Sequence, residues 1–242
     1  MRIPAGKGAV LLIGLLILFA QGAHAAPITF THYNNPGLFT DISGTGAPLN
    51  LNDDSVEIIA TTIGNAIFGA GTVVVGNNGG IGYDASSGLA FANAALPAAG
   101  AFSNATALLP FWNDIDEQTG NVYWQELGGA LIVQWHNRPH FLDIGSATFQ
   151  LQLFSAGSVL ARYVYQDVDF GSPPDANFGA SATIGYQVSS TEAYQYSFDS
   201  AVLANGDVID ITLTDSPEPG TLLLTASGLL AALAVQRARR RA

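Results

Sequence analysis

The 242-residue sequence contains no cysteine, a single lysine and little basic charge outside its two ends. The missing cysteines exclude disulfide bonds and thiolate chemistry, so burial of a core must stabilise the fold. Between residues 26 and 216 only Arg138 and Arg162 are basic, against 18 acidic residues, which gives a net charge of −16. Nucleic acids and anionic lipid surfaces are poor partners for such a domain, because both require a basic patch.

The sequence also lacks an apolar run of about 20 residues, the length that spans a bilayer as a helix. Residues 1–25 instead begin with two basic residues, continue with a shorter apolar stretch and end in Ala23-His24-Ala25. That order is typical of a secretory signal peptide with a small-residue cleavage site. We therefore predict export, with a mature chain that begins at Ala26. An uncleaved membrane anchor is the alternative.

The C-terminal residues 217–242 contain Pro217-Glu218-Pro219, an apolar run over residues 221–235 and four arginines, in that order. As a helix the run would measure about 22 Å, against a hydrocarbon core of about 30 Å. By the positive-inside rule the arginines would stay in the cytoplasm. The segment therefore predicts a short membrane helix that holds the exported part outside, and a plain tail anchor is the alternative.

Motif, apolar helix and arginine tail together resemble the PEP-CTERM sorting signal of Gram-negative bacteria. The resemblance implies recognition by an exosortase, a membrane transpeptidase, with cleavage near Pro217-Glu218-Pro219 and release or attachment at the cell surface. Before processing, the chain is then expected to be anchored transiently in the inner membrane. The resemblance covers about the last 26 residues and implies nothing about the domain before them.

Residues 26–216 have the length of one domain and read as strands separated by turn signals. No segment shows a sustained helical period, so we predict an all-β fold, an antiparallel two-sheet β-sandwich. Gln150 and Gln152 alternate with apolar residues, which predicts a half-buried strand. Strands are expected at residues 28–33, 56–62, 72–75, 130–136, 148–154, 158–166, 182–188, 194–198 and 208–213, with a loop over 85–105.

The stretch 109–124 is the acidic and aromatic centre of the sequence. An apolar run enters an acidic, amide-rich loop that ends at Gly120, and an alternating aromatic run leaves it. This pattern predicts a hairpin whose loop carries the charge. Trp112 and Trp135 continue apolar runs and are expected in the core.

Three segments resemble the NIDO-type extracellular domain of nidogen and its relatives: Pro110-Phe111-Trp112-Asn113-Asp114-Ile115-Asp116, Gly120-Asn121-Val122-Tyr123 and Thr148-Phe149-Gln150-Leu151-Gln152-Leu153. They occur in the family's order over roughly residues 50–187. Asn113 stands where the family usually has alanine, and Ala147 where it has asparagine. The resemblance implies adhesion or matrix association and provides no catalytic residues.

Asp114 and Asp116 are the candidate metal ligands, because closely spaced carboxylates in a loop with a sharp turn suit calcium. Glu117 lies beside them, but the spacing lacks the bidentate glutamate of calcium loops that bind tightly. We expect at most a weak site of the extracellular kind. The alternative is a solvated turn in which the aspartates cap backbone amides.

Tyr123 and Trp124 are the candidate glycan contacts, since exposed aromatic rings can stack on sugars. We predict a cell-surface or exopolysaccharide-matrix structural or adhesion protein that is not an enzyme, with the exosortase and extracellular polysaccharide or other surface proteins as partners. A secreted glycan-binding module is the alternative. A hydrolase that uses Asp114 and Asp116 as paired carboxylates is a third hypothesis.

Overall fold

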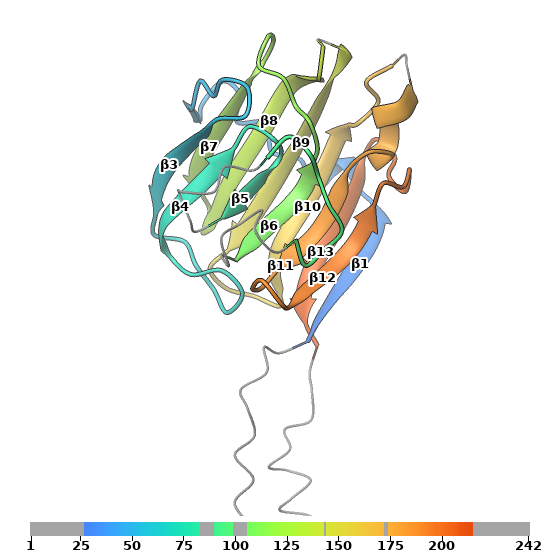
Figure 1. The fold of residues 1–242 in the computed structure, drawn as a ribbon. Coiled ribbons are helices and arrows are strands. Elements are labelled where there is room, and N and C mark those ends of the chain that lie inside the picture. The colour runs from blue at the N-terminus through green and yellow to red at the C-terminus, as the bar shows by residue number, and fades with distance from the viewer. Residues whose placement is uncertain (1–26, 83–89, 99–105, 143, 172–173, 215–242) are drawn as a thin grey trace, which may run out of the picture.

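The computed structural model describes residues 27–82, 90–98, 106–142, 144–171 and 174–214. The expected signal peptide (1–25) and the expected sorting segment (217–242) lie outside these residues. Within the described part of the chain, no helix has both the length and the apolar character needed to cross a membrane. The described residues form two antiparallel sheets packed face to face, as predicted for a β-sandwich (Figure 1).

The larger sheet has seven strands in the order β1-β13-β10-β9-β8-β7-β2. Its centre is a meander of long neighbouring strands, in which a turn at Gly157 closes the β9–β10 hairpin. The strands are β1 (Ile28–Asn34), β2 (Ala47–Pro48), β7 (Asn121–Leu127), β8 (Ala130–His140), β9 (Ile144–Phe154), β10 (Val159–Asp167) and β13 (Asp207–Leu213).

The smaller sheet has six strands in the order β12-β11-β6-β5-β4-β3. Two short 3₁₀ helices, η1 (Pro36–Leu38) and η2 (Pro174–Gly179), lie in connecting segments. The strands are β3 (Val56–Thr61), β4 (Gly71–Gly76), β5 (Gly80–Gly82), β6 (Ala107–Trp112), β11 (Thr183–Gln187) and β12 (Ala193–Phe198). β2 and β5 were not predicted, because two or three residues are too short to show a period.

The core lies between the sheets and is rich in aromatic rings. Trp135 stacks on Phe149 with 5.0 Å between ring centroids, and Phe111 of the opposite sheet packs on Phe149 at 5.3 Å. Trp112 and Trp135 are both fully buried, which confirms their prediction as core residues. Burial of side chains of this size contributes about 1.5 to 3 kcal/mol each.

Two buried tyrosines connect the sheets by hydrogen bonds across the core. The Tyr163 hydroxyl donates to the Gly185 carbonyl over 2.7 Å, and the Tyr165 hydroxyl donates to the Pro110 carbonyl over 2.7 Å. Burial raises the pKa of both hydroxyls well above the ordinary value. The tyrosines therefore remain neutral donors, and their hydrogen bonds fix the alignment of the two sheets.

The prediction of a hairpin around the acidic loop is wrong. β6 pairs with β5 and β11 in the smaller sheet, whereas β7 pairs with β8 and β2 in the larger sheet. The loop 113–120 therefore crosses from one sheet to the other. All six residues of β6 are buried, so this strand needs cover on both faces and sits inside a sheet between two neighbours.

The prediction of a half-buried β9 is also wrong. A segment that we call the strap (residues 35–46) runs across the outer face of the larger sheet and covers its polar side chains. Gln150 exchanges hydrogen bonds with Thr40, and Gln152 donates to the Leu38 carbonyl over 2.9 Å. The glutamine ladder thus formed consists of three buried side chains: Gln134, Gln150 and Gln152.

The two ends of the described domain lie together at one pole of the sandwich (Figure 1). Ile28 pairs with Leu213, and the Thr214 amide donates to the Pro27 carbonyl over 2.7 Å. The opposite pole, which we call the apex, carries the segments 49–55, 77–79, 113–120 and 141–142. Antiparallel pairing places these segments there, because β3, β5 and β7 begin at the apex and β4, β6 and β8 end there.

Candidate functional site

The loop 113–120 is held in place by two buried asparagines from the turn between β4 and β5. The Asn78 side-chain carbonyl accepts from the Ile115 amide over 3.0 Å, and the Asn77 amide group donates to the Ile115 carbonyl. Gly79 makes this possible: its φ is +80°, and a Cβ there would lie 1.9 Å from the Phe111 carbonyl oxygen. Nothing in the sequence around Asn77 and Asn78 indicates that these asparagines support the acidic loop.

A buried arginine lies beneath the loop. Arg138 of β8 is 1% exposed and donates to the Asn77 side-chain carbonyl, to the Leu51 carbonyl (3.3 Å) and to the Glu117 carbonyl (3.4 Å). Desolvation lowers the pKa of Arg138, while Glu117, Asp116 and Asp53 act in the opposite direction. No carboxylate of the described residues forms an ion pair with it. The positive charge of Arg138 therefore interacts with the carboxylates of Glu117, Asp116 and Asp53 without a direct contact.

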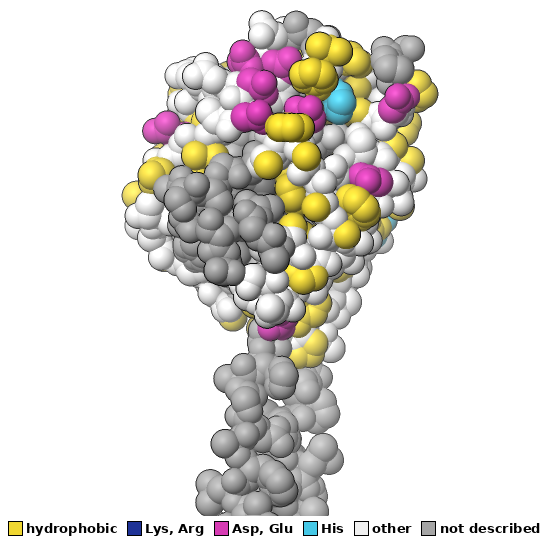
Figure 2. Space-filling view, in the orientation of Figure 1, with side chains coloured by type: hydrophobic (Ala, Val, Ile, Leu, Met, Phe, Trp, Pro, Cys, Tyr) yellow, Lys and Arg dark blue, Asp and Glu magenta, His cyan; other side chains and the backbone are white. Residues whose placement is uncertain are grey.

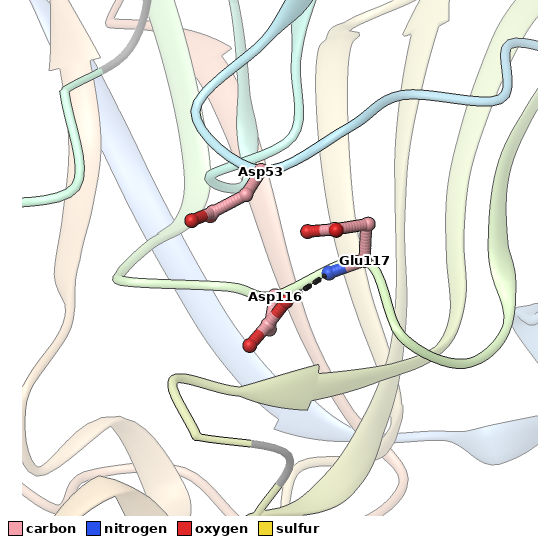
Figure 3. Close-up of side chains that lie close together, drawn as sticks. All are labelled: Asp53, Asp116 and Glu117. Atoms are coloured by element: carbon pink, nitrogen blue, oxygen red, sulfur yellow. Dashed lines mark hydrogen bonds between the residues drawn. The ribbon is translucent and has the colours of Figure 1, made fainter.

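Five acidic residues gather above this arginine. One carboxylate oxygen from each of Asp53, Asp116 and Glu117 lies within 4.8 Å of the other two, and we call these residues the acidic trio (Figure 3). Asp53 also belongs to a second trio with Asp54 and Asp114, under the same distance limit. Figure 2 shows acidic side chains gathered at this end of the molecule.

The crowding changes the proton affinity of the carboxylates. Burial, followed by the charges of Asp53, Asp54 and Asp116, raises the pKa of Asp114 to about 6. Burial and the neighbouring aspartates also raise the pKa of Asp53, and desolvation raises that of Glu117. The apex therefore carries negative charge that the protein does not fully neutralise.

The structure separates the two predicted metal ligands. Asp116 lies in the acidic trio and Asp114 in the second trio, and both trios depend on Asp53. The sequence offered only a weak signal for Asp53 and Asp54, which follow Asn52 in a turn about 60 residues before the loop. Antiparallel pairing of β3 with β4 brings that turn to the apex.

The two predicted glycan contacts lie on opposite faces of β7, because successive strand residues alternate. Trp124 packs against the main core between the sheets. Tyr123 packs on Ala130 and Ile132 at the outer face, with its ring 6.2 Å from that of His136. Both rings are half-buried, and they cannot stack on the same sugar.

Exposed apolar side chains border the acidic patch (Figure 2). Phe141 is 46% exposed and Leu142 is 69% exposed, at the tip that follows β8. The Phe141 amide donates to the Asp114 carbonyl over 3.1 Å, and the Asp116 amide donates to the Pro139 carbonyl over 3.0 Å. The apolar tip and the acidic loop are thus fixed to each other by their backbones.

Comparison with known proteins agrees with the sequence resemblance. No curated protein and no solved structure shows significant similarity to this chain. The family model described as NIDO-related matches residues 29–222, which is most of the chain and includes both sheets. The chain belongs to the NIDO-related family.

Proposed function

We propose that this chain is an exported structural or adhesion protein of the cell surface or the exopolysaccharide matrix, with no catalysis of its own. Membership of a family with extracellular-type domains supports the proposal. The geometric observation that carries it is the position of Thr214 at the pole opposite the apex. A tether that continues from Thr214 would direct the acidic and apolar apex away from the cell.

The sorting step belongs to the same proposal. An exosortase would recognise Pro217-Glu218-Pro219 while the apolar run holds the chain in the inner membrane of a Gram-negative cell. The processed protein would then remain at the surface or enter the matrix, where polysaccharide or other surface proteins are the expected partners.

Replacement of Pro217, Glu218 and Pro219 by alanine in the full chain tests this proposal. In a Gram-negative host with an exosortase, we expect the variant to accumulate unprocessed in the inner membrane, because its motif is lost. The matched control replaces Asp215 and Ser216 instead and should be processed normally. Surface retention of the alanine variant at the normal level would refute the sorting step.

Among the described residues, the arrangement nearest to a catalytic set does not favour hydrolysis. His32 contacts Asp207 over 2.8 Å with one ring nitrogen and the Tyr196 hydroxyl over 2.6 Å with the other. Burial and the charge of Asp207 raise the pKa of Tyr196. The raised pKa keeps this hydroxyl protonated and opposes its use as a nucleophile, although His32 lies beside it as a base.

A further inference from the structure

Four strands form the outer edges of the two sheets that the structure describes, and three of them carry features that oppose pairing with another chain. β2 is two residues long and contains Pro48, which has no N–H group to donate. β1 and β12 are joined by their side chains: the Tyr196 ring packs on Phe30 at 5.7 Å, and its hydroxyl lies 2.6 Å from Nδ1 of His32. The pairing of β12 with β11 also contains a bulge. The fourth edge is β3 (Figure 1).

β3 is a regular strand with little to oppose pairing at its open edge. All of its residues pair with β4 without a register shift, and they include no proline, lysine or arginine. Edge strands usually avoid other chains through prolines, bulges or charged side chains, lysine above all. Glu57 is the only charged residue of β3, and Ile58 is 52% exposed. At the end of the strand, Thr61 donates to Glu126 of β7 over 2.6 Å, so the free edge extends over residues 56–60.

The hydrogen-bond pattern shows which backbone groups of β3 face the open edge. The Asn77 amide donates to the Ser55 carbonyl over 3.0 Å, directly before the first pair of β3 and β4. In an antiparallel pair, hydrogen-bonded and non-hydrogen-bonded residue pairs alternate. Every second residue of β3 therefore bonds to β4, and the others present both backbone groups to the open edge: Val56, Ile58 and Ala60. Among the described residues, no group pairs with these outward N–H and C=O groups.

We propose that β3 pairs with β3 of a second copy of this chain, in an antiparallel register centred on Ile58. A two-fold axis at this residue places Ile58 opposite Ile58 of the other copy, and Val56 opposite Ala60. The N–H and C=O groups of all three residues then find partners, and the exposed Ile58 side chains cover each other on the same face. The smaller sheets of the two copies thus become one continuous sheet.

Neighbouring registers are less favourable. A shift by two residues in one direction would place Glu57 opposite Glu57 of the other copy, and like charges directly opposite are destabilising. A shift in the other direction would place Val56 opposite Thr62, whose amide already donates to Glu126. In the register centred on Ile58, the two Glu57 side chains are diagonal neighbours, about 7 to 8 Å apart, and repel only weakly.

A second copy is the occupant that this edge fits, because an antiparallel strand is complementary to itself about a two-fold axis. The domain is strongly acidic, so two copies can approach closely only through a surface with little charge. One strand from each copy buries less than the roughly 1,600 Å² of a standard interface, which predicts a transient dimer. This inference does not depend on how or where the chain is sorted.

Sedimentation equilibrium and amide hydrogen exchange of the purified full chain test the proposal. Between about 10 µM and 1 mM the chain should change from monomer to dimer, as a small interface implies. The amides of Val56, Ile58 and Ala60 should exchange more slowly at the higher concentration, because they gain partners. The amide of Ile59, which bonds to β4, should exchange at the same rate at both concentrations. A chain that stays monomeric would overturn the proposal and leave this edge to an extended segment of another protein.

Three variants separate pairing through β3 from other association. Ile58→Lys should weaken the dimer at least about tenfold, because it places two ammonium groups opposite each other. Thr31→Lys is the matched control: it adds the same charge at an exposed position of β1, the edge of the larger sheet, and should change the affinity less than about twofold. Glu57→Gln should strengthen the dimer about two- to threefold, because it removes a repulsion.

Thermal melts followed by circular dichroism establish that the variants fold. Equal weakening by both lysine variants would overturn the proposal, because association would then not depend on β3. A dimer that persists unchanged in Ile58→Lys would overturn it as well.

Discussion

Buried polar groups find partners differently in two regions of the molecule: the outer face of the larger sheet under the strap, and the apex. Under the strap, Gln134, Gln150 and Gln152 form hydrogen bonds with one another and with the backbone of residues 38–42, and Gln134 also donates to the Asp41 carboxylate. At the apex, five carboxylates gather, and the buried Arg138 interacts with three of them (Asp53, Asp116 and Glu117) without forming an ion pair. The polar groups under the strap are satisfied within the protein, whereas the apex keeps crowded carboxylates whose pKa values are raised.

The largest loss in the free energy of unfolding is expected at the apex. Arg138→Met would remove the only buried cation there and leave three acceptors without a donor: the Asn77 side chain and the Leu51 and Glu117 carbonyls. We expect a loss of about 3 to 5 kcal/mol in the free energy of unfolding. Urea unfolding in EDTA measures it.

Arg162→Met is the control for that comparison. Arg162 binds Asp210 through two nitrogens, but its side chain is 16% exposed at the outer face of β10. Its loss should cost less, about 1 to 3 kcal/mol, because Asp210 keeps a hydrogen bond from the Tyr33 hydroxyl. Equal losses for the two variants would contradict the view that Arg138 is the charged centre of the apex.

The next largest loss in the free energy of unfolding is expected under the strap. Gln150→Ala would leave both backbone groups of Thr40 without their side-chain partner. It would also remove one of the two hydrogen bonds of the Gln134 side-chain carbonyl and one of the two of the Gln152 amide group. We expect a loss of about 2 to 4 kcal/mol, because buried polar groups lose their hydrogen bonds. Gln166→Ala, at an exposed position of β10, is the matched control and should change stability by less than about 0.5 kcal/mol.

A pH series on Asp114→Asn sharpens the comparison further. The folded pKa of Asp114, about 6, exceeds the ordinary value of 3.8, so the folded state binds the proton more tightly than the unfolded state. In EDTA, this group should therefore add stability as the pH falls through 6, and the gain should be complete below about 3.8. The variant should lack this gain and be more stable at pH 7.5, by less than about 1 kcal/mol after solvent screening. An unchanged pH profile in the variant would place the effect elsewhere.

The smallest effect on stability is expected at Asp41 in the strap. Its pH dependence has the opposite sign to that of Asp114. Hydrogen bonds from Gln134 and from the Ser43 amide lower the pKa of Asp41. Asp41 therefore contributes stability above pH 3.8 that is lost as the pH falls through its folded pKa. Asp41→Asn should be less stable at pH 7 by under about 1 kcal/mol, since the group is exposed. Melts at pH 7 and pH 3 should show the difference shrinking at the lower pH.

The strand pattern could be predicted from the sequence because local periodicity carries it. Residues 28–33 and 208–213 were expected as separate strands, and they form β1 and β13 with nearly those bounds. The sequence could not indicate that the chain changes sheets after Trp112, because an apolar run looks the same in a hairpin and in a crossover. At the acidic loop and at β9, the strands themselves were therefore predicted correctly. What was wrong was which segments they pair with or are covered by.

The acidic site could be predicted only in part for the same reason. Asp114, Asp116 and Glu117 stand together in the sequence, and the structure keeps them at the apex. Asp53 and Asn77 reach the loop only through pairing of β3, β4 and β5, and Arg138 reaches it from β8. Contacts between residues 20 to 60 positions apart leave no trace in composition or spacing.

The antiparallel pair of β1 and β13 at the ends of the domain has a mechanical consequence. Because Pro27 and Thr214 lie side by side, tension applied between the two ends would open this pair one hydrogen bond at a time. A load applied at the apex and resisted at Thr214 would instead run along β13, where the hydrogen bonds to β1 and β10 share it in shear. The domain should therefore resist a pull from its apex with much greater force than a pull between its ends.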